Sequence, residues 1–252
     1  MSRRPLAIGP LALGPAPRVA VPFDDRVATE ELRALHARGL DLAELRIDRF
    51  AAHDPAAVRA VVDRCAAAGV PTLATIRIAA EGGGWRAGEA ERTKLFLALL
   101  DGVGAVDVEL RAGEVLREVL PAARAAGRLV IASFHDFAAT PALAALADVV
   151  ARAEAAGADV VKIATAVQGP DDVRTLARVL LEPCAIGRIV IGMGEAARAT
   201  RVLFPALGSL ITFAHAGDAT APGQLPLDEL VALLRQLGLR ADGAPAPPAA
   251  IA

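Results

Sequence analysis

Short apolar segments alternate with longer amphipathic segments along this chain of 252 residues. The short segments have the length and composition of buried strands, at 18–22, 43–48, 72–78, 105–110, 129–135, 159–165, 188–193 and 210–216. The longer segments repeat apolar residues at helical spacing, at 29–38, 55–68, 89–100, 113–126, 141–156, 170–181, 196–204 and 227–237. Because strands that alternate with helices form parallel sheets, the pattern predicts an α/β fold.

Eight strand–helix units in a chain of this length predict a closed (β/α)8 TIM barrel. Proline stands near the start of three expected helices, at Pro55, Pro141 and Pro170, where its missing amide proton costs nothing. An open doubly wound sheet is the alternative fold. It usually carries a glycine-rich turn after its first strand, and the segment 19–23 has none.

The two ends of the chain lie outside the repeating pattern. The segment 8–14 (Ile-Gly-Pro-Leu-Ala-Leu-Gly) is expected to form a small hairpin that closes the barrel floor. Residues 1–241 are interpreted as one catalytic domain. The tail 242–252 is rich in alanine and proline and is expected to be disordered.

Composition and charge argue against several other classes of protein. The formal net charge is −2 and the basic residues are scattered, so no nucleic-acid surface is expected. No apolar run approaches the roughly 18 residues of a membrane span. Glycine and proline at 9, 10 and 14 interrupt the start of the chain, so no signal peptide is expected. Cys65 and Cys184 are too few for a disulfide framework or a zinc site, and both fit a reduced, cytoplasmic protein.

Several expected strands carry polar residues at alternate positions, which places these residues on one face of each strand. The sets are Glu44, Arg46 and Asp48; Thr75 and Arg77; Asp107 and Glu109; Ser133 and His135; and Lys162. The apolar residues between them would face the helices, so the polar sets would face the barrel axis. A structural ion network of Glu44, Arg46 and Arg77 is one interpretation. A catalytic site is favoured because the charges gather toward strand C-terminal ends, the catalytic face of such barrels.

Lys162 is the most informative of these residues because it lies within the apolar run 159–164. A buried lysine must pair its ammonium or lose the proton. A neutral lysine in a pocket is a nucleophile for carbonyl groups, through a Schiff base. The alternative is a lysine at the strand end whose charged head reaches solvent.

Four further features could serve a site built around Lys162. His135 could move protons near neutral pH. The loop 81–85 (Glu-Gly-Gly-Gly-Trp) is either merely flexible or able to close over a ligand. Arg201 is either a surface residue or a fork for a carboxylate. Thr220 and Gln224 lie in a turn-like segment and could bind hydroxyl groups.

Six segments in order resemble type I 3-dehydroquinate dehydratase, a Schiff-base enzyme of the shikimate pathway. They are 44–48 (Glu-Leu-Arg-Ile-Asp), 75–77 (Thr-Ile-Arg) with 81–83 (Glu-Gly-Gly), 133–137 (Ser-Phe-His-Asp-Phe), 161–164 (Val-Lys-Ile-Ala), 193–194 (Met-Gly) and 221–224 (Ala-Pro-Gly-Gln). The resemblance implies a TIM barrel, usually a homodimer, without metal or organic cofactor, that acts on the small molecule 3-dehydroquinate.

The resemblance also implies a role for individual residues. Lys162 would form an imine with the substrate ketone, His135 would move the protons, and Glu44 would orient His135. The substrate pocket would be completed by the residues Arg46, Arg77, Arg201, Thr220, Gln224, Phe213 and Met193. Arg201 would clamp the substrate carboxylate, Thr220 and Gln224 would bind its oxygens, and Phe213 and Met193 would form apolar walls.

The chain departs from the family pattern at Pro22, Ile191 and Thr220, where a small hydroxyl residue, a methionine and a serine are common. Two other functions stay open. A class I aldolase shares the strand-borne lysine, but no clear phosphate-binding turn follows the seventh and eighth strands. A barrel that binds a shikimate-like ligand without turnover would have no need of a nucleophile such as Lys162.

Overall fold

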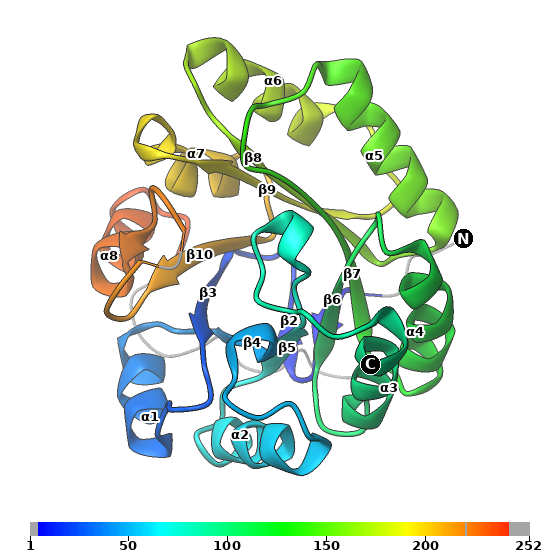
Figure 1. The fold of residues 1–252 in the computed structure, drawn as a ribbon. Helices are drawn as coiled ribbons and strands as arrows, with labels where there is room; N and C mark the ends of the chain where they lie inside the picture. Colours follow the sequence, from blue (N-terminus) through cyan, green and yellow to red (C-terminus); the bar gives the residue numbers. More distant parts are fainter. Residues whose placement is uncertain (1–4, 220, 242–252) are drawn as a thin grey trace.

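The computed structural model describes residues 5–219 and 221–241. Its centre is one curled sheet of parallel strands with helices around it (Figure 1). The neighbouring strands, in spatial order, are β11 (Leu225–Pro226), β10 (Ile211–His215), β3 (Arg18–Phe23), β4 (Leu42–Arg46), β5 (Thr72–Thr75), β6 (Ala105–Glu109), β7 (Leu129–Asp136), β8 (Val160–Ala166) and β9 (Gly187–Met193). The order follows the chain from β3 to β9, as a strand–helix repeat requires.

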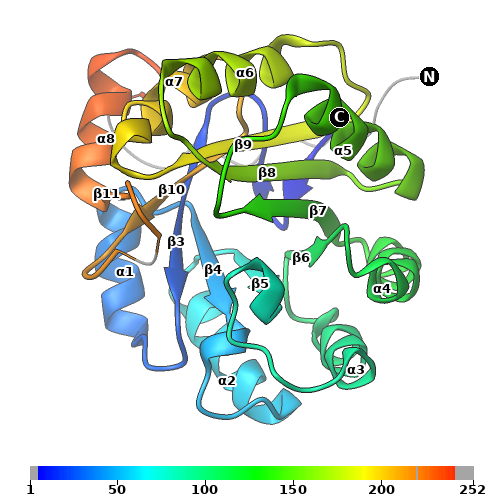
Figure 2. The same cartoon turned by 45° about the horizontal axis from the view of Figure 1, so that its top comes forward.

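Helices follow the strands and cover the outside of the sheet, which Figure 2 shows from a second side. They are α1 (Thr29–Arg38), α2 (Pro55–Ala67), α3 (Glu89–Leu99), α4 (Gly113–Ala125), α5 (Leu143–Ala156), α6 (Pro170–Leu181), α7 (Thr200–Ala206) and α8 (Leu227–Gln236). The predicted α/β TIM barrel is therefore confirmed, with β11 as an additional short strand beside β10.

The seam of the barrel, where β9 meets β10, is joined differently from the other pairs of neighbouring strands. Among the described residues, no regular ladder joins these two strands. The amide of Leu210 instead donates to the carbonyl of Arg188 at 2.9 Å, and the amide of Val190 donates to the Ser209 hydroxyl at 3.0 Å. A side chain thus replaces one rung of the ladder at the seam.

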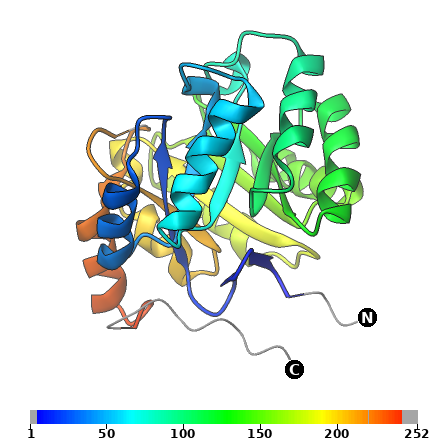
Figure 3. The ribbon, with the colours of Figure 1, turned by 90° about the horizontal axis from the view of Figure 1, so that it is seen from below.

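A small antiparallel hairpin, β1 (Ala7–Ile8) and β2 (Leu11–Ala12), lies beneath the ring of strands (Figure 3). Ile8 is fully buried in the cluster that fills the lower barrel. A Cβ atom on Gly104 would stand 2.6 Å from Ile8 Cγ2, so the hairpin fits closely against the start of β6. The hairpin expected at the barrel floor is therefore present. The tail 242–252 lies outside the described residues.

The barrel interior has an apolar lower part and a polar upper part. The lower part is one cluster of inward-facing residues that includes Ile8, Ala20, Leu42, Leu73, Ala105, Leu129, Ile131, Val160, Ile189 and Ile211. Farther along the same strands and on the same faces, the inward residues become Glu44, Thr75, Asp107, Ser133 and Lys162. A second cluster fills the space between sheet and helices, with residues such as Val21, Leu45 and Val108. The alternation of polar and apolar residues along each strand therefore correctly predicts which side chains point into the barrel.

Two predicted strands and one helix end differently in the structure. β4 stops at Arg46 and passes into a 3-10 turn at Ile47–Arg49, and β5 stops at Thr75. Beyond β5, the amide of Ile78 donates to a Glu109 side-chain oxygen at 3.0 Å instead of to a neighbouring strand. The helix expected at 196–204 is a 3-10 turn at Glu195–Ala197 followed by α7. No helix in the described part of the chain is long and apolar enough to cross a membrane.

Candidate active site

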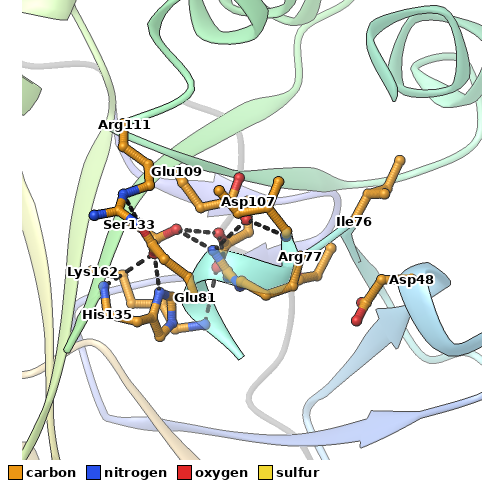
Figure 4. Close-up of polar contacts among 12 residues, drawn as sticks. Asp48, Ile76, Arg77, Glu81, Asp107, Glu109, Arg111, Ser133, His135 and Lys162 are labelled. Carbon is orange, nitrogen blue, oxygen red and sulfur yellow. Dashed lines mark hydrogen bonds and ion pairs between the residues drawn. The ribbon is translucent and has the colours of Figure 1, made fainter. Parts of the chain in front are cut away.

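Lys162 lies on β8 with its side chain directed into the polar upper barrel (Figure 4). It is 4 % exposed, so its ammonium does not reach solvent as a strand-end lysine would. Its Nζ atom lies 2.9 Å from Asp107 Oδ2 and 3.5 Å from Glu44 Oε1, and it stands 4.7 Å from the ring centre of Phe213. The buried charge is therefore paired with carboxylates and rests on an aromatic face.

Asp107 is shared by three donors. Besides Lys162, it accepts from Arg77 at 2.7 Å and from the Ser133 hydroxyl at 2.6 Å. Burial by itself would raise the pKa of Asp107, but the charges of Arg77 and Lys162 outweigh burial and hold that pKa well below its ordinary value. Asp107 is therefore a fixed negative charge beside the lysine.

Arg77 is buried and serves mainly to hold neighbouring groups. It donates to Asp107, to Ser133 Oγ at 2.7 Å, and pairs with Glu109 at 3.2 Å. Burial opposes its charge, yet Asp107 and Glu109 raise the pKa of Arg77 above its ordinary value. Glu109 in turn pairs at 2.6 Å with Arg92, which is fully buried on α3. The result is a chain of alternating charges from the barrel axis to the helix layer.

His135, near the end of β7, is held by Glu81. One oxygen of Glu81, Oε2, lies 2.9 Å from His135 Nδ1 and also accepts the His135 backbone amide at 3.1 Å. Burial raises the pKa of Glu81 to about 7, although Arg77 opposes this shift. Burial, and then the charges of Arg77 and Lys162, lower the pKa of His135 well below its ordinary value. A neutral imidazole near the lysine can accept a proton.

The expected orientation of His135 by Glu44 is wrong in this structure. Glu44 accepts from the Thr75 hydroxyl at 3.0 Å and pairs with Lys162, and among the described residues it forms no hydrogen bond or ion pair with His135. Glu81 takes that place because the turn after β5 directs it toward β7. The sequence signal for Glu81 is the Glu-Gly-Gly run at 81–83, which by itself predicts only a loop that is flexible or closes over a ligand.

The Glu81–Trp85 segment is a clamped turn rather than a flexible loop. A Cβ atom on Gly83 would stand 1.9 Å from the carbonyl oxygen of Arg77, and the amide of Gly84 donates to Asp48 Oδ2 at 2.8 Å. The Trp85 side chain is buried, which helps to hold the turn in place. Glycine is needed here because two backbone segments approach closely.

The residues expected around Lys162 gather in one pocket. The described members of the expected set, Glu44, Arg46, Arg77, His135, Lys162, Met193, Arg201, Phe213 and Gln224, all line it, together with Ile191 and Glu81. Thr220 lies outside the described residues. Arg46 is already paired with Asp48 through two contacts of 2.8 and 2.9 Å. Arg77 is already paired with Asp107 through one contact of 2.7 Å. These two arginines are therefore less available for a ligand than the sequence suggested.

Arg201, on α7, differs from the other pocket arginines. It is 3 % exposed, and its Nε atom is buried with no hydrogen-bond partner among the described residues. One contact of its side chain is a long hydrogen bond of 3.4 Å to the carbonyl of Pro222. Burial lowers the pKa of Arg201 to about 10, so it remains charged at neutral pH. A buried cation with an unused donor can receive a carboxylate.

Gln224 is positioned by the turn after β10. Gly223 has φ +76°, and a Cβ atom there would stand 2.3 Å from the carbonyl oxygen of Gly194. The amide of Gly194 donates to the carbonyl of Pro222 at 3.2 Å, which ties this turn to the end of β9. The Gln224 side chain accepts from the amide of Ala221 at 3.2 Å. The turn therefore brings Gln224 to the same pocket as Lys162.

Comparison with known proteins identifies the family of this chain. The family model described as Type I 3-dehydroquinase matches residues 19–241. A 3-dehydroquinate dehydratase from Methanosarcina acetivorans is 38 % identical over 240 residues, which cover 91 % of this chain and 98 % of the relative. The crystal structure of 3-dehydroquinate dehydratase from Geobacillus kaustophilus superposes with a TM-score of 0.87 at 31 % identity, over 95 % of this chain and 98 % of that one.

A type I 3-dehydroquinate dehydratase from Clostridium difficile, solved with covalent modified comenic acid, gives a TM-score of 0.86 at 28 % identity, over 93 % of this chain and 98 % of that one. The family match, the extent of the relatives' coverage and the barrel with its buried lysine all lead to the same assignment. The chain belongs to the type I 3-dehydroquinase family.

Proposed function

We propose that this protein is a 3-dehydroquinate dehydratase that eliminates water from 3-dehydroquinate to give 3-dehydroshikimate, through an imine on Lys162. The observation that carries the proposal is a single buried lysine in the pocket, next to a histidine that is held by a carboxylate. Membership in the family supports the substrate, because the relatives carry the name of this reaction.

In the proposed reaction, the Lys162 ammonium gives up a proton and its amine adds to the substrate ketone. Two of the original ammonium protons leave with the ketone oxygen as water, and an iminium remains. The iminium withdraws electrons, so the neighbouring C–H bond becomes acidic. His135 removes that proton, and the electron pair forms an enamine. The enamine expels the β-hydroxyl group, which takes the proton from His135 and leaves as water. Hydrolysis of the imine releases 3-dehydroshikimate and restores Lys162.

The contacts of His135 fit this sequence of proton transfers. Its Nδ1 atom is held by Glu81, which leaves Nε2 as the nitrogen available to the substrate. A neutral imidazole takes the proton, and the adjacent carboxylate stabilises the imidazolium until the proton is given to the leaving hydroxyl. Such general acid–base help is typically worth about 10²–10⁴ in rate.

The substrate carboxylate is proposed to bind Arg201, because Arg46 and Arg77 already have carboxylate partners. Gln224 lines the same pocket and would bind substrate hydroxyl groups, together with Thr220. Phe213 and Met193 are both buried and would form the apolar wall against the substrate ring.

Absorbance of the conjugated enone product tests the activity, and mass spectrometry after borohydride reduction tests the nucleophile. Lys94 and Lys162 are the two lysines of the chain, and Lys94 is exposed on α3. Wild type and Lys94→Arg should therefore both turn over substrate and gain one trapped adduct. Lys162→Ala should do neither. Turnover by Lys162→Ala, or an adduct on Lys94, would contradict the proposed nucleophile.

We also propose, from the family resemblance, a homodimer that works in the cytoplasm in aromatic amino acid biosynthesis. Light scattering on the purified protein should give twice the mass of one chain, and the mass of one chain would contradict the dimer. Expression should restore growth without aromatic supplements to a strain that lacks this dehydratase. Failure there, with an active enzyme, would favour a role in quinate breakdown.

A further inference from the structure

Arg111 contacts the Glu81–His135 pair from outside the pocket (Figure 4). It follows β6 in a turn that is fixed on both sides, because the Leu110 amide donates to the carbonyl of Ser133 and the Ala112 amide donates to the carbonyl of Glu109. Its Nε atom lies 3.3 Å from Glu81 Oε1, while the other oxygen of Glu81 holds His135. We propose that Arg111 is a positioning residue for the proposed dehydratase reaction. It acts through Glu81 to keep His135 ready to accept a proton.

The charge of Arg111 matters because the pKa of Glu81 lies close to neutral pH. The Glu81 side chain is 1 % exposed, and burial raises its pKa to about 7. At neutral pH, a modest change in the surrounding charge therefore shifts a large part of the population between carboxylate and carboxylic acid. Only the carboxylate can balance the positive charge that His135 gains during catalysis.

The charged groups that face this pair come from every neighbouring strand. The charged groups around Glu81 are Arg77 beyond β5, Asp107 and Glu109 on β6, Arg111 after β6, and His135 on β7. The charges of Lys162 on β8 and Arg46 on β4 also lower the pKa of His135. Arg46, Arg77 and Lys162 are each paired with another carboxylate. Within the described part of the chain, Glu81 is the one ion-pair partner of Arg111.

The sign of the effect does not depend on which group of the pair carries the proton. Removing a positive charge next to two coupled groups makes protonation of the pair easier, so the pair takes up its proton at higher pH. The acid limb of the kcat/KM profile should then move upward. Because the Arg111 side chain is 54 % exposed, solvent screens it, and we expect a shift of about half a pH unit.

Three variants test the proposal. Arg111→Met should shift the acid limb upward by about half a pH unit and lower kcat/KM about threefold below the limb, with little change well above it. Arg111→Lys keeps the charge and should restore the wild-type profile. Arg117→Met is the matched control. Arg117 lies on α4 and pairs with the exposed Glu114 of the same helix, so this variant should leave the profile unchanged.

Salt provides a second comparison. High salt should move the acid limb of wild type in the same direction, because an exposed arginine is screened. Arg111→Met should respond less. A profile that falls equally at all pH values in Arg111→Met would point to a structural role and overturn the proposal, as would an unchanged profile.

A readout without turnover separates this proposal from the proposed function. The His135 nitrogen signals, assigned with a His135→Asn variant, can be titrated by NMR in wild type and in Arg111→Met. An upward shift of the titration in Arg111→Met supports the proposal even if the wild-type protein fails to dehydrate 3-dehydroquinate. The absence of any shift overturns it even if the enzyme is active.

Discussion

At the scale of single residues, the unused Nε donor of Arg201 gives the pocket a binding site for one negatively charged group. Hydrogen bonds that involve a charged group contribute about 1.5–3 kcal/mol. Replacing Arg201 by methionine should therefore raise KM by about 10- to 100-fold, with a smaller change in kcat, because the carboxylate is remote from the reacting carbon.

Steady-state kinetics of Arg201→Met and Arg201→Lys, over substrate concentrations from well below KM up to saturation, measures this effect. The lysine variant should recover part of the affinity, because it restores a point charge without the planar fork. A fall in kcat with KM unchanged would place Arg201 away from the substrate carboxylate.

Glu81 opposes stability while it serves catalysis. Its pKa is about 7 in the folded protein, against about 4.3 in an unfolded chain. Between these two values the folded state binds more protons, so stability falls as pH rises through this window. Glu81→Gln should therefore be more stable than wild type at pH 8, by up to about 3 kcal/mol, and this difference should shrink to about 1 kcal/mol at pH 5, near the lower edge of the window.

Urea unfolding of both proteins at pH 5 and pH 8 checks the expected difference. The variant should also be a slower enzyme, because an amide cannot balance the charge on His135. Equal stability of the two proteins at pH 8 would show that ionisation of Glu81 does not oppose folding.

At the scale of elements, the turn after β5 converts a strand end into a support for His135. Gly83→Ala places a Cβ atom against the Arg77 carbonyl, so the turn must move and carry Glu81 with it. Displacement of a catalytic group by about 1 Å can cost about 10² in rate. We expect a loss of that size in kcat/KM.

Gly113→Ala is the matched control, because a Cβ atom on Gly113 meets nothing within 4 Å at the start of α4. Its activity should equal that of wild type. Wild-type activity in Gly83→Ala would mean that the turn accommodates the methyl group without moving Glu81.

The alternation of polar and apolar residues was sufficient to predict the elements and the inward face of the strands. Lys162, Asp107 and Ser133 could be placed toward the axis by position alone, since side-chain direction has a period of two. The partner of His135 could not be predicted, because Glu81 reaches it across 54 residues from a turn whose path depends on Asp48 and Glu109. The counter-ions of Lys162 could not be assigned either, because its contacts with Asp107 and Glu44 depend on the packing of separate strands.

At the scale of the whole molecule, stability and chemistry occupy different depths of one barrel. Ile8 belongs to the apolar floor, whereas the polar residues lie farther along the strands. Ile8→Ala should cost about 2–5 kcal/mol of folding free energy, because it removes buried methyl groups and leaves a cavity. The kcat of the folded protein should not change.

Thermal unfolding combined with activity below the transition measures both quantities. Leu11→Ala, in the same hairpin but only half-buried, should cost less. A lower kcat in Ile8→Ala at a temperature where the protein is folded would show that the floor also controls the site.

The contact between Asp107 and Lys162 has a consequence for the reaction intermediate. Conversion of the ammonium to an iminium keeps the same positive charge on nearly the same atom, so Asp107 can act as a counter-ion before and after the imine forms. The intermediate then needs no counter-ion from solvent or substrate. A permanent counter-ion favours the protonated imine, which is the form that makes the adjacent carbon acidic.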